Sequence, residues 1–139
     1  MELVAVDVGG TNARFAIAEV ADGRVRTIRE PVRLPPADHD GLPSAWNAAA
    51  RQFGRPMPRA AAIALASPID GDFLHLTNNP WVVRPSLLGE QLGVDCCTLV
   101  NDFAAIGHAV AQLDETHFAH LCGPETPFPR RNAITVCGP

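Results

Sequence analysis

The stretch LVAVDVGGTNARFAIAEV, from Leu3 to Val20, decides the fold that the sequence predicts. It contains two apolar runs, Leu3–Val8 and Ala13–Val20, which have the length and composition of β-strands. A pair of glycines separates them, and glycine pairs between strand-like runs are typical of β-hairpin turns. We therefore predict two adjacent antiparallel strands with Gly9 and Gly10 at their turn.

Short apolar runs alternate with helical patterns along the rest of the chain. Ala60–Ala66 is short enough for a buried strand, although its alanine content leaves a helix open. The order of elements predicts an α/β layered domain with a mixed sheet. After the hairpin we predict a strand at Arg24–Leu34, a loop at Pro35–Pro43 and a helix at Ser44–Phe53, which Ser44 caps and Gly54 ends. We then predict strands at Ala60–Ala66 and from Phe73, an irregular segment at Thr77–Ser86, and a helix at Ser86–Leu92 that Gly93 ends. The last predicted elements are a buried strand at Cys97–Val100, a helix at Phe103–Leu113 with Asp102 at its cap, and strands at Phe118–Leu121 and Ala133–Val136.

The composition favours a soluble, cytoplasmic protein of one domain. The 139 residues are 47% apolar, which is enough for a hydrophobic core. The net charge is −4 and no Lys/Arg run stands out, so nucleic acid and anionic membranes are poor candidate partners. Met1–Leu3 lacks the basic start of a signal peptide, and the apolar run Ala60–Ile69 is far too short to span a membrane.

The cysteines and histidines do not indicate a metal site. None of the cysteines forms a CxxC pair, which favours buried thiols in a reducing compartment. His117 and His120, with Cys122, offer metal-binding side chains, but the two histidines would lie on opposite faces of the predicted strand. The four cysteines are Cys96, Cys97, Cys122 and Cys137.

The motif DVGGTN at the hairpin tip suits a metal–polyphosphate ligand. Glycines let backbone N–H groups approach an anion closely, and Thr11 and Asn12 add side-chain donors. Asp7 lies near the strand end, where a carboxylate can hold Mg²⁺ directly or through water. The alternative is a plain hairpin turn with a solvated Asp7, and no Walker motif GxxxxGK[ST] occurs.

Three further segments carry candidate binding or catalytic side chains. In LVNDF, Asn101 and Asp102 emerge from a buried strand, so Asp102 either faces a substrate hydroxyl or only caps the next helix. The loops LASPIDGD (65–72) and LTNNPW (76–81) are stiffened by prolines. Asn78 and Asn79 offer amide groups that suit sugar hydroxyls, with ordinary turn chemistry as the alternative.

The segments DVGGTNAR, IALASPIDGD, LTNNPW and LVNDFAAIGHA resemble the bacterial glucokinase family in order and spacing, over nearly the whole chain. That family belongs to the superfamily of sugar kinases and actin. The resemblance therefore implies an α/β domain of the ribonuclease H-like, actin-like ATPase fold, with a mixed central sheet flanked by helices. It also implies phosphoryl transfer from Mg·ATP to the 6-hydroxyl of glucose, with ATP and Mg²⁺ as cofactors, and it leaves a homodimer as one candidate assembly.

The resemblance assigns roles to residues of this sequence. Asp102 matches the family's catalytic base and Asn101 the neighbouring sugar-binding amide. The turn Ser67–Pro68 and Asn78 match segments that line the sugar pocket. The stretch that resembles the first phosphate loop consists of Asp7, Gly9, Gly10, Thr11 and Asn12. Within it, the resemblance implies that Asp7 holds Mg²⁺ and that the other four residues lie near the phosphates of ATP.

Members of this family continue beyond the point where this sequence stops. The expectation is that residues 1–139 are the N-terminal small domain of a glucokinase-like protein, with the C-terminal domain and its second phosphate loop absent, and that this chain alone is inactive. The alternative function is a non-catalytic sugar-binding or sensing module, or an inactive truncated remnant. The retention of Asp7 and Asp102 favours catalysis, and the first strand starts at Leu3, which leaves no room for a preceding DNA-binding helix-turn-helix.

Overall fold

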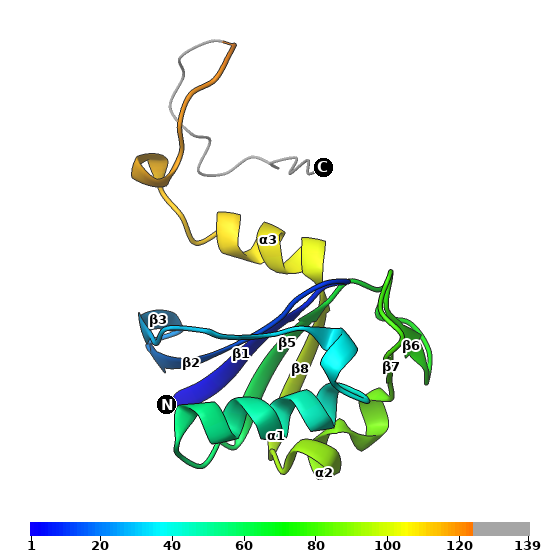
Figure 1. Ribbon diagram of the computed structural model, residues 1–139. Helices are drawn as coiled ribbons and strands as arrows, with labels where there is room; N and C mark the ends of the chain where they lie inside the picture. The colour runs from blue at the N-terminus through cyan, green and yellow to red at the C-terminus, as the bar shows by residue number, and fades with distance from the viewer. Residues whose placement is uncertain (124–139) are drawn as a thin grey trace. The chain divides into compact units, whose positions relative to one another are not determined.

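The computed structural model describes residues 1–123 and divides the chain into two units. The first unit comprises residues 1–102 and contains the central sheet, as Figure 1 shows. The second begins at residue 103 and contains most of one helix. The strand predicted at Ala133–Val136 lies outside the described residues.

The predicted N-terminal hairpin is confirmed. Strands β1 (Glu2–Val8) and β2 (Ala13–Ala21) pair antiparallel, and their last pair before the turn joins Val8 to Ala13. The turn between them, Gly9–Asn12, is closed by a hydrogen bond of 2.9 Å from the Gly9 N–H to the Asn12 carbonyl. Neither turn glycine has a positive φ, so left-handed backbone is not the reason for glycine here.

The single strand predicted at Arg24–Leu34 is wrong, because the structure breaks it in two. Strands β3 (Arg24–Ile28) and β4 (Val32–Leu34) both pair antiparallel with β2. Pro31 lies in the interruption, and proline cannot donate a hydrogen bond to a sheet partner. The break therefore falls where the chain lacks a backbone donor.

Two parallel strands complete the central sheet and confirm that it is mixed. Strand β5 (Ala60–Leu65) pairs parallel with β1, and β8 (Cys96–Asn101) pairs parallel with β5. The six-stranded sheet has the order β3-β2-β1-β5-β8, with β4 also on β2. The segment predicted at Ala60–Ala66 is thus a strand rather than a helix, although it ends at Leu65, and its alternate side chains enter the core.

The first helix, α1 (Leu42–Phe53), starts earlier than predicted. Its N-cap is Gly41 rather than Ser44, so the predicted Ser44 cap is wrong. Pro43 stands in the first turn, where its missing N–H costs nothing, and Leu42 is already 2% exposed in the core. Gly54 ends the helix with a left-handed φ of 64°, as predicted.

The second helix, α2 (Leu88–Leu92), follows a 3₁₀ turn at Pro85–Leu87. Gly93 ends it with a φ of 65°, which confirms the predicted stop. Together these two elements replace the single helix predicted at Ser86–Leu92.

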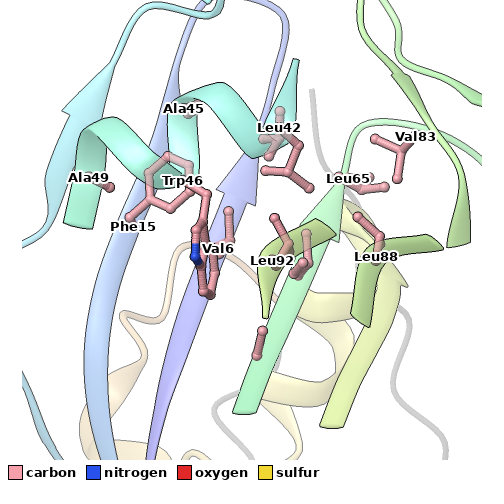
Figure 2. Packing of buried hydrophobic residues seen from close by; sticks show 14 of the residues in the cluster. Val6, Phe15, Leu42, Ala45, Trp46, Ala49, Leu65, Val83, Leu88 and Leu92 are labelled. Carbon is pink, nitrogen blue, oxygen red and sulfur yellow. The ribbon is translucent and has the colours of Figure 1, made fainter. Parts of the chain in front are cut away.

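The core of the first unit lies between the sheet and helices α1 and α2, on one side of the sheet (Figure 1). Figure 2 shows Trp46 of α1 beside Val6 of β1 and Phe15 of β2. The rings of Phe15 and Trp46 meet edge to face at 6.4 Å. Truncation of a buried tryptophan costs about 3–5 kcal/mol, so this packing fixes the strands that carry the candidate site.

A small ribbon connects β5 to α2. Strands β6 (Leu74–His75) and β7 (Val82–Val83) pair antiparallel, so Thr77–Ser86 is not irregular throughout. Leu74 and Val83 are both buried, and their burial supports a pairing that the sequence did not indicate. The ribbon holds the loop Thr77–Trp81 between its strands.

The second unit contains less regular structure than predicted. Helix α3 (Asp102–Val110) begins at Asp102 itself and ends before Leu113. The predicted strand at Phe118–Leu121 is wrong, since only a 3₁₀ turn at Glu115–His117 forms nearby. Because no strand forms there, His117 and His120 do not lie on opposite faces of a strand, as the sequence analysis had assumed. His117 Nδ1 instead lies 2.9 Å from Asp114 Oδ1.

The cysteines are less buried than predicted. Cys96 and Cys122 are exposed, and Cys97 is half-buried, all three as free thiols. Cys96 and Cys97 belong to β8, which among residues 1–123 pairs with β5 alone, and this is consistent with their exposure. Burial, together with the neighbouring Cys96, raises the pKa of the Cys97 thiol. Over residues 1–123, the structure has no helix with the length and apolar character needed to cross a membrane.

Candidate functional site

The candidate site lies at the carboxyl ends of three neighbouring strands. Val8 of β1 is level with Leu65 of β5, and Leu65 is level with Asn101 of β8. The segments that follow these strands are therefore brought to one edge of the sheet. Ligands of α/β proteins bind outside the carboxyl ends of strands, so this edge is the expected place for chemistry. The sequence-predicted residues at this edge are Gly9, Gly10, Thr11, Asn12, Ser67, Pro68, Asn101 and Asp102.

Gly9 and Gly10 differ in the space that the fold leaves for a side chain. A Cβ on Gly10 would lie 3.0 Å from Asn78 Cβ and 3.2 Å from the Asn78 carbonyl oxygen, which is too close for ordinary contact. A Cβ on Gly9 would meet only the Asn12 carbonyl oxygen, at an ordinary 3.7 Å. The fold therefore explains glycine at Gly10 but leaves room for a side chain at Gly9.

The polar side chains of the turn face solvent. Thr11 and Asn12 are exposed, and Asn12 Nδ2 donates to Thr11 Oγ1 at 3.0 Å. Exposed hydroxyl and amide groups are donors of the kind that phosphate oxygens accept from, whereas the Gly9 N–H already donates to the Asn12 carbonyl.

Asp7 forms an ion pair with Arg14, a residue that the sequence motifs alone did not indicate as part of the site. Arg14 Nη1 lies 3.0 Å from Asp7 Oδ2, and about half of each side chain is exposed. The two residues are opposite each other in the β1–β2 register, so counting outward from the turn would have found the pair. The ion pair places one cation and one anion at the base of the turn.

Asp7 fits a magnesium site of the kind completed by substrate phosphates. Mg²⁺ is usually held by one or two carboxylates together with phosphate oxygens and water, rather than by a cage of protein ligands. Within the described part of the chain, no group of three or more His, Cys, Asp or Glu side chains could hold a metal. Asp7 offers a single half-exposed carboxylate beside the Gly9–Asn12 turn, which is compatible with a magnesium ion held mainly by phosphate oxygens and water.

The Ser67–Pro68 turn is tied to both neighbouring strands. The Ala66 N–H donates to the Val8 carbonyl at 3.0 Å, and Asn101 Nδ2 donates to the Ser67 carbonyl at 3.1 Å. Ser67 is 4% exposed, and its hydroxyl donates to the Pro68 carbonyl at 3.0 Å. Ser67 is therefore part of the frame of the site, whereas Pro68 is exposed.

The loop Thr77–Trp81 lies against the Gly9–Asn12 turn. Asn78 is exposed and has a left-handed φ of 55°, which asparagine tolerates better than most residues. Asn79 is 8% exposed, and its Nδ2 donates to the Gly9 carbonyl at 3.0 Å. The two asparagines thus have different roles, and the prediction that Asn79 offers its amide to a sugar does not fit its burial.

Asn101 and Asp102 stand where β8 gives way to α3. Asn101 Nδ2 donates to Asp102 Oδ1 at 3.0 Å as well as to the Ser67 carbonyl. Asp102 is half-buried and is the first residue of α3, where the helix dipole favours a negative charge. The carboxylate is therefore held at the sheet edge by the neighbouring amide.

Solved structures of sugar kinases share this fold. A glucokinase from an Antarctic psychrotroph matches with a TM-score of 0.73 and 30% identity, covering 83% of this chain and 36% of that chain. A ROK hexokinase from Thermus thermophilus matches with a TM-score of 0.56 and 24% identity, covering 81% of this chain and 38% of that chain. The mixed sheet and its flanking helices are thus those of sugar kinases with the actin-like ATPase fold.

The sequence narrows this class to one family. A family model described as Glucokinase matches residues 3–139, so the chain belongs to the glucokinase family. It is 50% identical over 139 residues to the glucokinase of Zymomonas mobilis, covering all of this chain and 43% of that protein. The chain therefore spans less than half the length of this curated relative.

Proposed function

We propose that this chain is the N-terminal domain of a glucokinase that transfers the γ-phosphoryl group of Mg·ATP to the 6-hydroxyl of glucose. The observation that carries the proposal is the meeting of two motifs at one sheet edge. The Gly9–Asn12 turn follows β1, and the Asn101–Asp102 pair lies at the end of β8, with hydrogen bonds from Ala66 to Val8 and from Asn101 to Ser67. An anion site and a carboxylate on one edge suit phosphoryl transfer to a hydroxyl.

Asp102 is the proposed base in this reaction. Its carboxylate would accept a hydrogen bond from the 6-hydroxyl and take its proton as the oxygen forms a bond to the γ-phosphorus. The bond from that phosphorus to the bridging oxygen of ADP then breaks. Asn101 orients the carboxylate, since Nδ2 of Asn101 lies 3.0 Å from Asp102 Oδ1. Such orientation of the reacting hydroxyl is a large part of catalysis in phosphoryl transfer.

The Gly9–Asn12 turn is the proposed cradle for the β- and γ-phosphates. Its N–H groups and the donors of Thr11 and Asn12 would bind phosphate oxygens, and Arg14 adds a positive charge beside Asp7. Asp7 would hold Mg²⁺, directly or through water. When bound, the metal neutralises charge on the transferred group.

The sugar would lie between Asp102 and the exposed Asn78. Asn78 offers donors and acceptors to sugar hydroxyls, and Asn101 is the second proposed sugar-binding amide. The Ser67–Pro68 turn would form a wall of the pocket, with the exposed Pro68 nearer the ligand than the buried Ser67.

The test is an activity assay on the complete protein of which this chain is a part. We expect formation of glucose 6-phosphate that requires both ATP and Mg²⁺, followed by a coupled dehydrogenase assay. Glucose binding without ATP-dependent turnover would instead indicate a sugar-binding or sensing module. Absence of both glucose binding and turnover would contradict the proposed function altogether.

A further inference from the structure

We propose that Asn79 is a positioning residue that joins the Gly9–Asn12 turn to the loop Thr77–Trp81, so that the two loops act as one rigid unit. This inference rests on the proposed function for the identity of the two ligands, phosphate and sugar. The connection itself rests only on contacts within residues 1–102. It assigns to Asn79 a role distinct from that of its neighbour Asn78.

The side chain of Asn79 bridges two backbone segments. Its Nδ2 donates to the Gly9 carbonyl at 3.0 Å, across 70 residues of sequence. Its Oδ1 accepts from the Trp81 N–H at 3.0 Å, which folds the loop back on itself. With 8% exposure, the amide is shielded from water, so replacement of these bonds by water is disfavoured.

The same two loops also meet through a backbone contact that does not involve the Asn79 side chain. Gly10 lies so close to Asn78 that an added Cβ would be 3.0 Å from Asn78 Cβ. In addition, the Thr77 N–H donates to the Ala66 carbonyl at 2.9 Å. The loop is thus held both against the Gly9–Asn12 turn and against the residue that follows β5.

Trp81 anchors the loop to the body of the unit. It is 2% exposed, and its Nε1 donates to the His39 carbonyl at 2.9 Å. The loop is therefore fixed at Trp81 and reaches the Gly9–Asn12 turn through Asn79. A displacement of either loop must move the other or break the Asn79 bond to Gly9.

This connection fixes the separation of the two ligand loops. The Gly9–Asn12 turn would hold the γ-phosphate, and Asn78 would hold the sugar that attacks it. Reacting atoms must be about 3–3.5 Å apart in the productive complex, and a small misplacement can cost about a hundredfold in rate. Asn79 would therefore affect nucleotide binding and turnover although it touches neither ligand.

Two variants of the complete kinase test the inference. Asn79→Ala removes both hydrogen bonds without adding charge, and Asn79→Asp keeps the acceptor for the Trp81 N–H but turns an oxygen toward the Gly9 carbonyl. We expect kcat/KM for ATP to fall about tenfold or more in both variants. The matched control is Ile63→Val, which removes one methyl group from a buried β5 side chain whose sheet partners are Val6 and Leu99.

A second measurement does not depend on catalysis. Hydrogen exchange at the Gly9 amide, which is bonded to Asn12, should be about tenfold faster in the Asn79 variants, because opening of the turn costs less free energy. Exchange in the strands β1 and β5 should stay as in the wild type. In Ile63→Val, the ratio of the exchange rate of the Gly9 amide to the exchange rates in β1 should stay as in the wild type.

The outcomes separate this inference from the proposed function. Wild-type exchange at Gly9 together with wild-type kinetics for ATP in the Asn79 variants would overturn the inference. If Asn79→Ala does not fold, Asn79→Asp carries the same test. Faster exchange at Gly9 in a protein that never phosphorylates glucose would support the link between the loops and contradict the proposed function.

Discussion

Asp7 and Arg14 face each other across the β1–β2 hairpin, with Arg14 Nη1 3.0 Å from Asp7 Oδ2. The pair stands directly below the Gly9–Asn12 turn, where Val8 and Ala13 form the last step of the ladder. An exposed ion pair of this kind contributes at most about 1 kcal/mol to stability. Because the pair lies at the base of the proposed phosphate loop, we expect it to affect ligand binding more than folding.

We expect Arg14→Gln in the complete kinase to raise the KM for ATP about tenfold, because loss of a charged donor to phosphate is worth about 1.5–3 kcal/mol. The denaturation midpoint should hardly change. The control is Arg26→Gln, which breaks an exposed ion pair between Arg26 of β3 and Asp22 of the turn between β2 and β3. Equal effects of both variants on the KM would contradict a specific role for Arg14.

The two turn glycines should respond differently to alanine. Gly9→Ala should leave the free energy of unfolding unchanged, because the structure has room for the added Cβ, but should weaken ATP binding by crowding the phosphate. Gly10→Ala should lower stability by about 1–3 kcal/mol, because the methyl group would push against Asn78. Urea unfolding and ATP titration measure the two effects; an unstable Gly9→Ala variant would refute this distinction.

The hairpin could be predicted from local sequence, whereas the sheet edge that gathers the site residues could not. The glycine pair between two apolar runs was enough to place the β1–β2 turn, because turn chemistry acts over a few residues. The motif residues around Gly9 and Asp102 could be placed together only through parallel pairing of β1, β5 and β8. The resemblance implied a mixed sheet but not these pairings, which only the structure shows, because apolar runs alone do not state which strands are neighbours.

Features that depend on distant contacts were missed. The burial of Asn79 depends on the Gly9 carbonyl, 70 residues away in the sequence, so the two adjacent asparagines looked alike. The start of α1 was misplaced because Leu42 packs into the core, which local capping rules do not register. Phe118–Leu121 has the composition of a strand but gains no partner among the described residues. In each case tertiary packing overrides a local preference.

The ion pair of Glu2 predicts a pH dependence of stability. Arg55 donates two hydrogen bonds to the carboxylate, at 3.1 and 2.6 Å, and lowers the pKa of Glu2 from its ordinary value of 4.5. Because the folded pKa is the lower one, the stabilisation is complete above the unfolded value and is lost as the pH falls through the folded value. Glu2→Gln should therefore be less stable than the wild type at pH 7 and equal to it at low pH.

Urea unfolding of both proteins between pH 7 and pH 3 measures this difference. The control is Glu30→Gln, which changes an exposed carboxylate in the turn between β3 and β4. A stability gap between the wild type and Glu2→Gln that stays constant over this pH range would show that the Glu2 carboxylate does not act through its charge.

We expect the 139-residue chain by itself to bind glucose weakly and to turn over no ATP. It covers 43% of the length of the Zymomonas mobilis glucokinase, so a site shared with the remainder of such a protein would make only part of its contacts. Each tenfold loss of affinity corresponds to only about 1.4 kcal/mol. Robust formation of glucose 6-phosphate by the purified chain would show that the chain holds a sufficient site.

The variant Asp102→Asn in the complete kinase tests the central claim, that this chain supplies the base for phosphoryl transfer to glucose. Asparagine has the same shape, suits the start of a helix and can accept a hydrogen bond, so the fold and the glucose Kd should change little. It cannot take the proton from the 6-hydroxyl, and a positioned base contributes about 10²–10⁴-fold. The decisive measurement is kcat together with the glucose Kd. We predict a fall in kcat of about a hundredfold or more at a nearly unchanged Kd, whereas an unchanged kcat would remove Asp102 from catalysis and contradict the account.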